Sequence, residues 1–178
     1  MDRLTLARAI NATAAILAAA CARPDPAATS RADTYAVYAA AIDSFPAPAR
    51  PVPVESQTRP YSLARSLGDT SALYSAVRGD TGLTAELIAA YERANASPEA
   101  LCDCFPKALS VELKAERTLP GTPGPVMLSG VGFDPPRRRA LVWVAQSCGP
   151  LCGSSALFLL VRRGKNWVVS RRVLTSAS

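Results

Sequence analysis

The sequence contains no histidine, and only 19% of its residues are charged. Without histidine the chain cannot build a Ser-His-Asp triad, a Cys-His dyad or a histidine-containing zinc site. It has neither a Walker loop nor a G-x-G-x-x-G motif, so nothing supports the binding of a nucleotide phosphate. No apolar run reaches the roughly 18–20 residues of a membrane span. These absences exclude the commonest catalytic and nucleotide-binding chemistries, and we expect no cofactor.

The length and composition indicate one folded domain. The chain has 178 residues, 49% of them hydrophobic, and a formal net charge of +6. That length suits a single domain, and the apolar fraction argues against a disordered chain. A chain of about 150 residues hides roughly 70% of its unfolded surface, so a sizeable core is expected. No internal repeat is present.

Residues 1–20 have the pattern of an export signal. Arg3 and Arg8 precede a 12-residue apolar stretch over residues 9–20, which is too short for a membrane span and typical of a signal peptide. Residues 17–21 resemble the lipobox of bacterial lipoproteins, in which cleavage leaves Cys21 as the acylated N-terminus. Two acyl chains hold a protein stably on a membrane. The expected localisation is therefore the bacterial cell envelope, lipid-anchored and facing the periplasm.

Two alternatives for the N-terminus stay open. Cleavage at Ala20-Cys21-Ala22, used as an A-x-A site, would discard Cys21 and release a soluble secreted or periplasmic protein. An uncleaved N-terminal helix is the third. In the favoured interpretation, the Pro- and Ala-rich residues 21–32 form a flexible tether, and residues 33–178 form a single α+β domain.

The N-terminal half of the domain is expected to be mainly helical. Tyr35, Tyr38 and Ile42 share a helix face, with Asp33 or Thr34 as the N-cap and Pro46 as the stop. The clearest helix covers residues 84–95. Shorter helical segments are expected at residues 69–77, from residue 97 onward and at 110–117, and a short edge strand at 52–54.

The C-terminal third changes to β-branched and aromatic runs. Four such runs are separated by gaps of turn length, which predicts an antiparallel four-stranded meander. They cover residues 126–133, 140–147, 156–162 and 167–174. The two middle runs are apolar on both faces, whereas a sheet with water on one side would alternate. We therefore expect the helices to pack on this meander in a two-layer α+β domain.

Four cysteines follow the signal region: Cys102, Cys104, Cys148 and Cys152. An even number in an exported domain favours disulfides, with three pairings open. Cys148 and Cys152 flank a predicted hairpin turn, where facing residues approach as closely as a disulfide requires. Cys102 and Cys104 could pair with each other, bridge across to the hairpin, or join a four-thiolate zinc site of unusual spacing. A redox site is less favoured, because the thioredoxin-type C-x-x-C pattern is absent.

Basic residues are concentrated near the C-terminus. Residues 131–178 contain eight basic residues and one acidic residue, Asp134. Strand alternation places two basic turns at the same end of the meander. They hold Arg137, Arg138, Arg139, Arg162, Arg163 and Lys165. Such a rim suits phosphate head groups, anionic glycans or an acidic partner protein. The plain alternative is a pair of solvated turns, and nucleic acid is not expected because few aromatic residues are available to stack on bases.

No catalytic residue can be assigned. Glu112 and Glu116 have the spacing of one helix face, which is more often solvated than catalytic. Ser129 lacks both the nucleophile-elbow glycine two residues before it and a histidine to activate it. No metal site is expected either.

Four segments share a pattern with known sequences: S-x-V-G-F-[ND] at residues 129–134, A-L-V-x-V at 140–144, G-x-L-[CA]-G at 149–153, and W-x-V at 167–169. In them the chain resembles a family of uncharacterised exported bacterial proteins. It departs from their pattern at Ser154-Ser155 and Pro135-Pro136. The resemblance implies the architecture and no activity.

The sequence thus favours a non-catalytic envelope lipoprotein domain that binds a partner protein or an anionic envelope component. An inhibitor or immunity protein for an exported enzyme is the alternative, because it too needs no chemistry of its own. A thiol-dependent enzyme is a weaker one, based on the cysteines alone.

Overall fold

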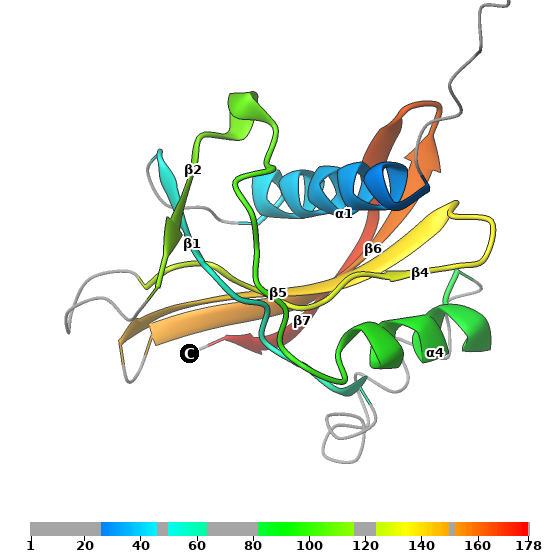
Figure 1. The fold of residues 1–178 in the computed structure, drawn as a ribbon. Coiled ribbons are helices and arrows are strands. Elements are labelled where there is room, and N and C mark those ends of the chain that lie inside the picture. The colour runs from blue at the N-terminus through cyan, green and yellow to red at the C-terminus, as the bar shows by residue number, and fades with distance from the viewer. Residues whose placement is uncertain (1–25, 46–49, 64–81, 116–123, 150–151, 178) are drawn as a thin grey trace, which may run out of the picture.

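The computed structural model describes residues 26–45, 50–63, 82–115, 124–149 and 152–177 (Figure 1). Within these ranges the chain is an α+β fold in which two α-helices pack on a mostly antiparallel sheet. The short helical segment expected at residues 69–77 lies outside the described residues.

The main sheet is built from the C-terminal part of the chain. Three long strands pair antiparallel in chain order: β5 (Arg139–Gly149), β6 (Cys152–Arg163) and β7 (Asn166–Ala177). On the other side of β5 lie two short strands, β3 (Met127–Leu128) and β4 (Gly132–Phe133). The expected meander is therefore only partly correct, because its first strand is two separate strands.

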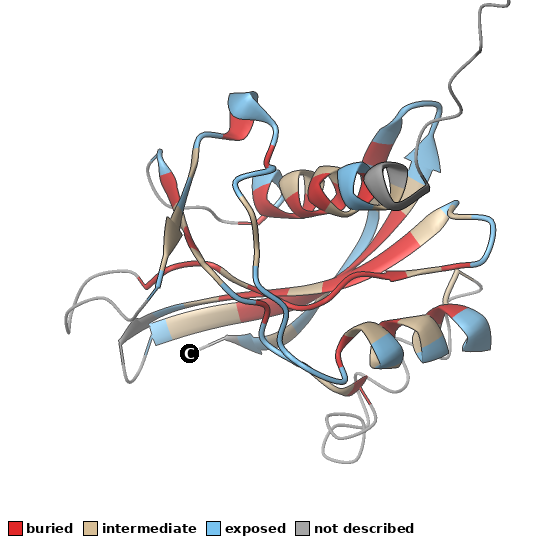
Figure 2. Cartoon of the chain, viewed as in Figure 1, coloured by how far each residue is buried: buried red, intermediate tan, exposed pale blue. Residues whose placement is uncertain are grey.

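The two central strands bury both of their faces, as Figure 2 shows in red. On one face Val142, Phe158 and Leu160 join a core with α1 (Pro26–Asp43). On the other face Leu141 and Leu157 pack with α4 (Ala85–Ala94). The helices thus lie on opposite faces of the sheet (Figure 1), and the expectation of two layers is wrong. A strand that is apolar on both faces needs cover on both.

Helix α1 presents Tyr35, Tyr38 and Ile42 to the core, as their spacing predicts. It begins at Pro26, so Asp33 lies inside the helix and is not its N-cap. Residues 26–32, which we expected in the tether, form the first part of the helix. Helix α4 has the N-cap and extent that its sequence predicts: the Thr84 hydroxyl accepts a hydrogen bond from Leu87 N at 3.3 Å.

Two short strands, β1 and β2, lie in the region where the sequence predicts one edge strand and one helix. Strand β1 (Val52–Glu55) is the strand expected at 52–54, and it pairs in parallel with β2 (Val111–Lys114). The prediction of a helix at residues 110–117 is therefore wrong for residues 111–114, which form β2. A 3₁₀ turn, Lys107–Leu109, precedes β2. The helix expected from residue 97 is also absent from the described residues 97–106.

Strand β1 also bonds on its other side, so it is not an edge. Val126 N donates to Pro53 O at 2.7 Å, and Glu55 N donates to Val126 O at 2.9 Å. These bonds link the β1–β2 pair to the segment that leads into β3, and through it to the main sheet.

The segment from Ser129 to Asp134 is shaped by its contacts with α4 and β5. The Ser129 hydroxyl accepts a hydrogen bond from Trp143 N at 2.9 Å, so it replaces a backbone carbonyl in the ladder with β5. The side chain of Asn95, at the end of α4, bonds both backbone groups of Gly130: Oδ1 accepts from Gly130 N at 2.9 Å and Nδ2 donates to Gly130 O at 3.1 Å. The S-x-V-G-F-[ND] pattern therefore has a structural explanation, and Ser129 is fully buried with its hydroxyl engaged in hydrogen bonds to the backbone.

Glycine is required in this segment because the helix backbone lies against it. A Cβ on Gly132 would fall 2.4 Å from Tyr91 Cα, and one on Gly130 would fall 2.2 Å from Ala94 O. Both neighbouring atoms are backbone, which cannot rotate away as a side chain can.

We predict that Gly132→Ala lowers the free energy of unfolding by about 1–3 kcal/mol or more, because α4 must move off the sheet. Urea denaturation followed by circular dichroism measures the change. Gly164→Asn is the control: a Cβ there meets nothing within 4 Å, and asparagine tolerates the left-handed backbone at φ 62°. The control should stay within about 0.5 kcal/mol of the original chain. Equal midpoints for Gly132→Ala and the original chain would contradict the close helix contact.

Candidate functional site

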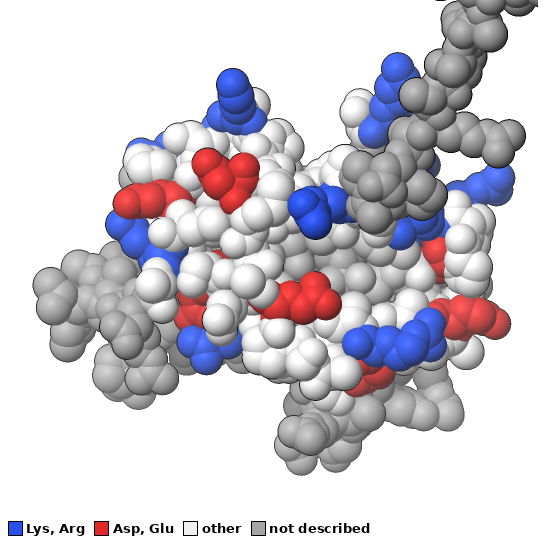
Figure 3. All heavy atoms as spheres, in the orientation of Figure 1, with Lys and Arg blue, Asp and Glu red and all other residues white. Residues whose placement is uncertain are grey.

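The two basic turns lie together at one end of the sheet, as strand alternation predicts. The β4–β5 turn leads into Arg139 and the β6–β7 turn follows Arg163. Arg162 N donates to Arg138 O at 2.8 Å, which joins the two turns directly. Figure 3 shows Lys and Arg atoms at this end of the molecule, where α1 begins. We call this cationic surface the basic rim; it consists of Arg137, Arg138, Arg139, Arg162, Arg163 and Lys165.

A buried carboxylate holds two members of the basic rim. The Asp33 side chain is only 10% exposed, and its Oδ2 receives Arg137 Nε at 3.2 Å and Arg162 Nη1 at 3.1 Å. Its Oδ1 accepts from Trp167 Nε1 at 3.4 Å. Asp33 therefore ties α1 to both turns of the rim. Hydrogen bonds to a charged group are about twice as strong as neutral ones, so these contacts fix both guanidinium groups.

Aromatic rings support the same two arginines. The Arg137 guanidinium carbon lies 3.9 Å from the centroid of the Phe133 ring, and that of Arg162 lies 5.7 Å from the Trp167 ring. A guanidinium over an aromatic face is attracted by the ring quadrupole. Both side chains remain about one-third exposed, so each still presents part of its charge to solvent.

The remaining cations of the rim are less constrained. Arg139 donates to Gly82 O at 3.3 Å. Arg138, Arg163 and Lys165 are exposed, and their side chains have no ion-pair partner among the described residues. The carboxylate of Asp134 is turned inward, where Oδ1 accepts from Arg138 N and Arg139 N at 2.7 and 2.8 Å. The carboxylates of Asp33 and Asp134 are thus both buried, and the exposed charged side chains of the two turns are basic.

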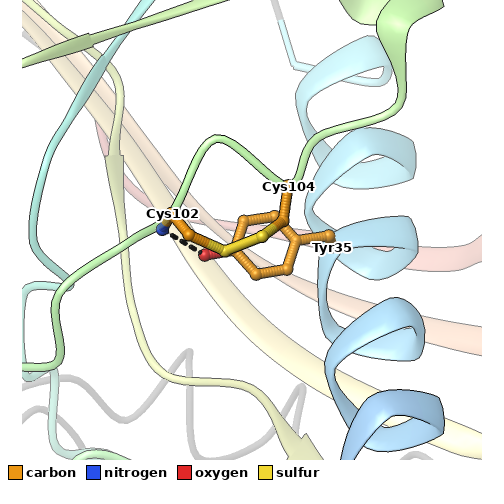
Figure 4. The surroundings of a disulfide bond; sticks show 3 residues. All are labelled: Tyr35, Cys102 and Cys104. Atoms are coloured by element: carbon orange, nitrogen blue, oxygen red, sulfur yellow. Dashed lines mark hydrogen bonds between the residues drawn. A yellow bond between two sulfur atoms is a disulfide. The ribbon is translucent and has the colours of Figure 1, made fainter.

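The Cys102–Cys104 pair forms a disulfide, with 5.2 Å between the two Cα atoms. Of the alternatives open for this pair, the structure takes the bridge of the two residues to each other. Cys102 N donates to the Tyr35 hydroxyl at 2.7 Å, so the disulfide loop is held against α1 (Figure 4). Cys102 and Tyr35 line a cavity of about 460 Å³. The ring of Phe105 lies 4.8 Å from that of Tyr35, which packs the loop into the core.

The predicted Cys148–Cys152 disulfide involves one described side chain, that of Cys152. Cys152 is disulfide-bonded, and its partner lies outside the described side chains, as does the side chain of Cys148. The Cys148–Cys152 bridge stays a prediction. Among the described residues no group of three or more cysteine or acidic side chains is placed to hold a metal ion.

Tyr38 shows how firmly the α1 face is buried. Desolvation raises the pKa of its hydroxyl far above the ordinary value, with the nearby Tyr35 a smaller cause. The hydroxyl donates a hydrogen bond to Ser129 O at 3.0 Å. This bond joins α1 to the segment that carries the S-x-V-G-F-[ND] pattern, so Tyr38 has a structural role.

The acidic residues considered for catalysis are not brought together. Glu112 lies on β2 and pairs with Lys114, and Glu116 is outside the described residues. A second cavity, of about 770 Å³, lies beside β1, where Arg59 pairs with Glu55. The hydrogen bond with Glu55 raises the pKa of Arg59 above its ordinary value. The wall holds no described cysteine and no pair of facing carboxylates.

The sequence pattern predicts the basic rim but not the role of Asp33, which pairs with Arg137 and Arg162. Asp33 precedes Val37 by four residues and Ala41 by eight, so it lies on the buried face of the helix. A buried carboxylate needs charged or hydrogen-bonding partners. The position of Asp33 on the apolar face of the helix could therefore have identified it as a partner of the basic residues.

We predict that Asp33→Asn lowers the free energy of unfolding by about 1–3 kcal/mol, because Arg137 and Arg162 lose their charged acceptor. Urea denaturation measures the loss. Asp43→Asn is the matched control on the same helix: Asp43 is 57% exposed and its pair with Arg50 is solvated, so the change should be at most about 0.5 kcal/mol. If both variants behave alike, Asp33 does not hold the rim.

Within the described residues, no helix combines the length and apolarity required to cross a membrane. Searches of protein-family models, curated proteins and solved structures found no match to the chain. The resemblance to exported bacterial proteins therefore stays a prediction.

Proposed function

We propose that this chain is a non-catalytic domain of the bacterial cell envelope, anchored by a lipid on Cys21, that binds a partner protein or an anionic envelope component through the basic rim. The observation that carries the proposal is the charge arrangement. Cations from two turns meet at one end, while the two neighbouring carboxylates, Asp33 and Asp134, are buried and engaged. Arginine suits such a role because its planar fork matches carboxylates and phosphates.

The cysteine chemistry supports the export part of the proposal. Disulfides persist in oxidising compartments and are rare in the cytosol. Cys102 and Cys104 are bonded to each other, which leaves neither as a thiolate nucleophile, so this pair does not favour a thiol-dependent enzyme. The lipobox at residues 17–21 and the short apolar stretch before it support the anchor.

Preorganisation distinguishes the rim from an ordinary basic surface. Arg137 and Arg162 are fixed by Asp33 and by aromatic rings, so they lose little side-chain freedom on binding an anion. Arg138, Arg163 and Lys165 surround them and are exposed. A concentration of like charge of this kind also attracts an oppositely charged partner over a distance.

We predict that the rim controls retention on heparin-agarose, a polyanionic matrix. The double variant Arg138→Glu/Arg163→Glu should elute at a much lower salt concentration than the original chain, because two rim cations become acidic. Arg93→Glu/Lys107→Glu is the matched control, since it makes the same change in net charge at exposed residues outside the rim. Equal elution of the two double variants would count against a specific role for the rim.

The anchor is tested separately, by the intact mass of the protein from its native membrane fraction, measured with and without reductant and alkylation. We predict a polypeptide that begins at Cys21, carries acyl chains and takes up alkylating reagent only after reduction. A soluble form without acyl chains would contradict the anchor, and free thiols before reduction would favour thiol chemistry.

A further inference from the structure

We propose that the anionic component is the membrane itself: the basic rim docks on the anionic phospholipid head groups of the bilayer that holds the Cys21 anchor. This inference rests on the proposed function and names the partner of the same surface. Three observations carry it: the position of α1, the contacts of its first turns, and the direction of the long strands.

The first observation is the short covalent distance from the anchor to the fold. Helix α1 begins at Pro26, five residues after Cys21. Five residues span at most about 18 Å however they are arranged. The start of α1 therefore cannot lie farther than this from an acylated Cys21, whose chains are in the bilayer.

The second observation is that the rim contacts the first turns of this helix. Arg137 Nη2 donates to Ser30 O at 3.4 Å, and both Arg137 and Arg162 reach Asp33. Ser30 is four residues into the helix, only about 6 Å along its axis from Pro26. The rim is therefore at the end of the domain that the anchor holds next to the membrane.

The third observation is the direction of the sheet. Strands β5, β6 and β7 all extend between the rim and the opposite end of the sheet, and the β5–β6 hairpin with Cys152 is at that opposite end (Figure 1). Strand β6 has 12 residues, so the hairpin is roughly 36 Å from the rim. Docking through the rim would place the two basic turns on the head groups and direct the Cys152 hairpin away from the bilayer.

Proximity favours lipid as the occupant over an acidic protein, since both would complement the positive charge of the rim. The anchor keeps a head-group layer within reach of the rim at all times, whereas a protein partner must diffuse to it. Each Lys or Arg close to an anionic leaflet strengthens association about fivefold. Arg138, Arg163 and Lys165 have no ion pair among the described residues, so they are available for such contacts.

The two tryptophans of the chain give a direct measurement. Trp167 lies at the rim beside Arg162, and Trp143 is about 13 Å farther along the sheet than Arg139. The full protein from its native membrane fraction is reconstituted into vesicles that contain a dansyl-labelled lipid head group, and energy transfer from tryptophan to dansyl is recorded. Trp143→Phe and Trp167→Phe variants separate the two donors.

We expect stronger transfer from Trp167 in vesicles of phosphatidylcholine and phosphatidylglycerol than in vesicles of phosphatidylcholine alone. High salt should remove the difference, because it screens exposed charges. Transfer from Trp143 should be weaker in both. Arg138→Glu/Arg163→Glu should reduce the ratio of docked to undocked protein by more than about tenfold, whereas Arg93→Glu/Lys107→Glu should leave it unchanged. Arg163→Glu/Lys165→Glu serves as a second rim variant if the first does not fold.

Equal transfer from Trp167 in the two kinds of vesicle overturns the inference, as does a rim variant that behaves like its control. The heparin experiment separates this failure from failure of the proposed function. If the rim governs heparin retention but lipid composition has no effect, the rim binds an anionic partner other than the membrane. An unacylated mature protein would overturn both the anchor and the inference that depends on it.

Discussion

The rest of the structure depends on the two-sided burial of the central strands. Residues along β5 and β6 are apolar on both faces, so the strand pair is stable only when both faces are covered. Helix α1 supplies one cover, and α4 with the segment around Leu63 supplies the other. The close approach of α4 to Gly130 and Gly132, and the use of Asn95 as a substitute strand partner, follow from this requirement.

The candidate site is a by-product of the same arrangement. The helix that covers one face carries Asp33, and this carboxylate anchors cations from two turns that are distant in the sequence. The positions of Arg137 and Arg162 are therefore fixed by the fold, while Arg138, Arg163 and Lys165 are exposed and form no ion pair with any other described residue. Such a combination of fixed and exposed charges suits a charged surface better than a single small ligand.

Features that depend on local pattern were predictable from the sequence. The β-branched runs located the strands, and strand alternation placed the basic turns at one end. Thr84 and the apolar spacing after it identified α4. Strand β2 was mistaken for a helix because four residues, Val111–Lys114, carry too little periodicity, and their partner β1 lies about sixty residues earlier.

The remaining errors have a related cause. Asp33 has the local features of an N-cap, but tertiary contacts with residues more than a hundred positions away give it another role. The second layer of cover was implied by the strands, because β5 and β6 are apolar on both faces and need cover on both. The pattern within α4 does not record that this helix supplies it. Local signals predict elements well, and they do not predict which distant element completes them.

The position of the sheet in the chain has a consequence for the order of folding. Strands β5, β6 and β7 occupy the last forty residues, yet both of the described α-helices, α1 and α4, pack on the sheet that they form. A chain that emerges N-terminus first, from a ribosome or through an export channel, presents α1 and α4 long before the surface that they cover. The helices have no sheet to pack against until synthesis or transfer is nearly complete. Isolated helices of this length are only marginally stable, so the chain stays largely unfolded for most of that time.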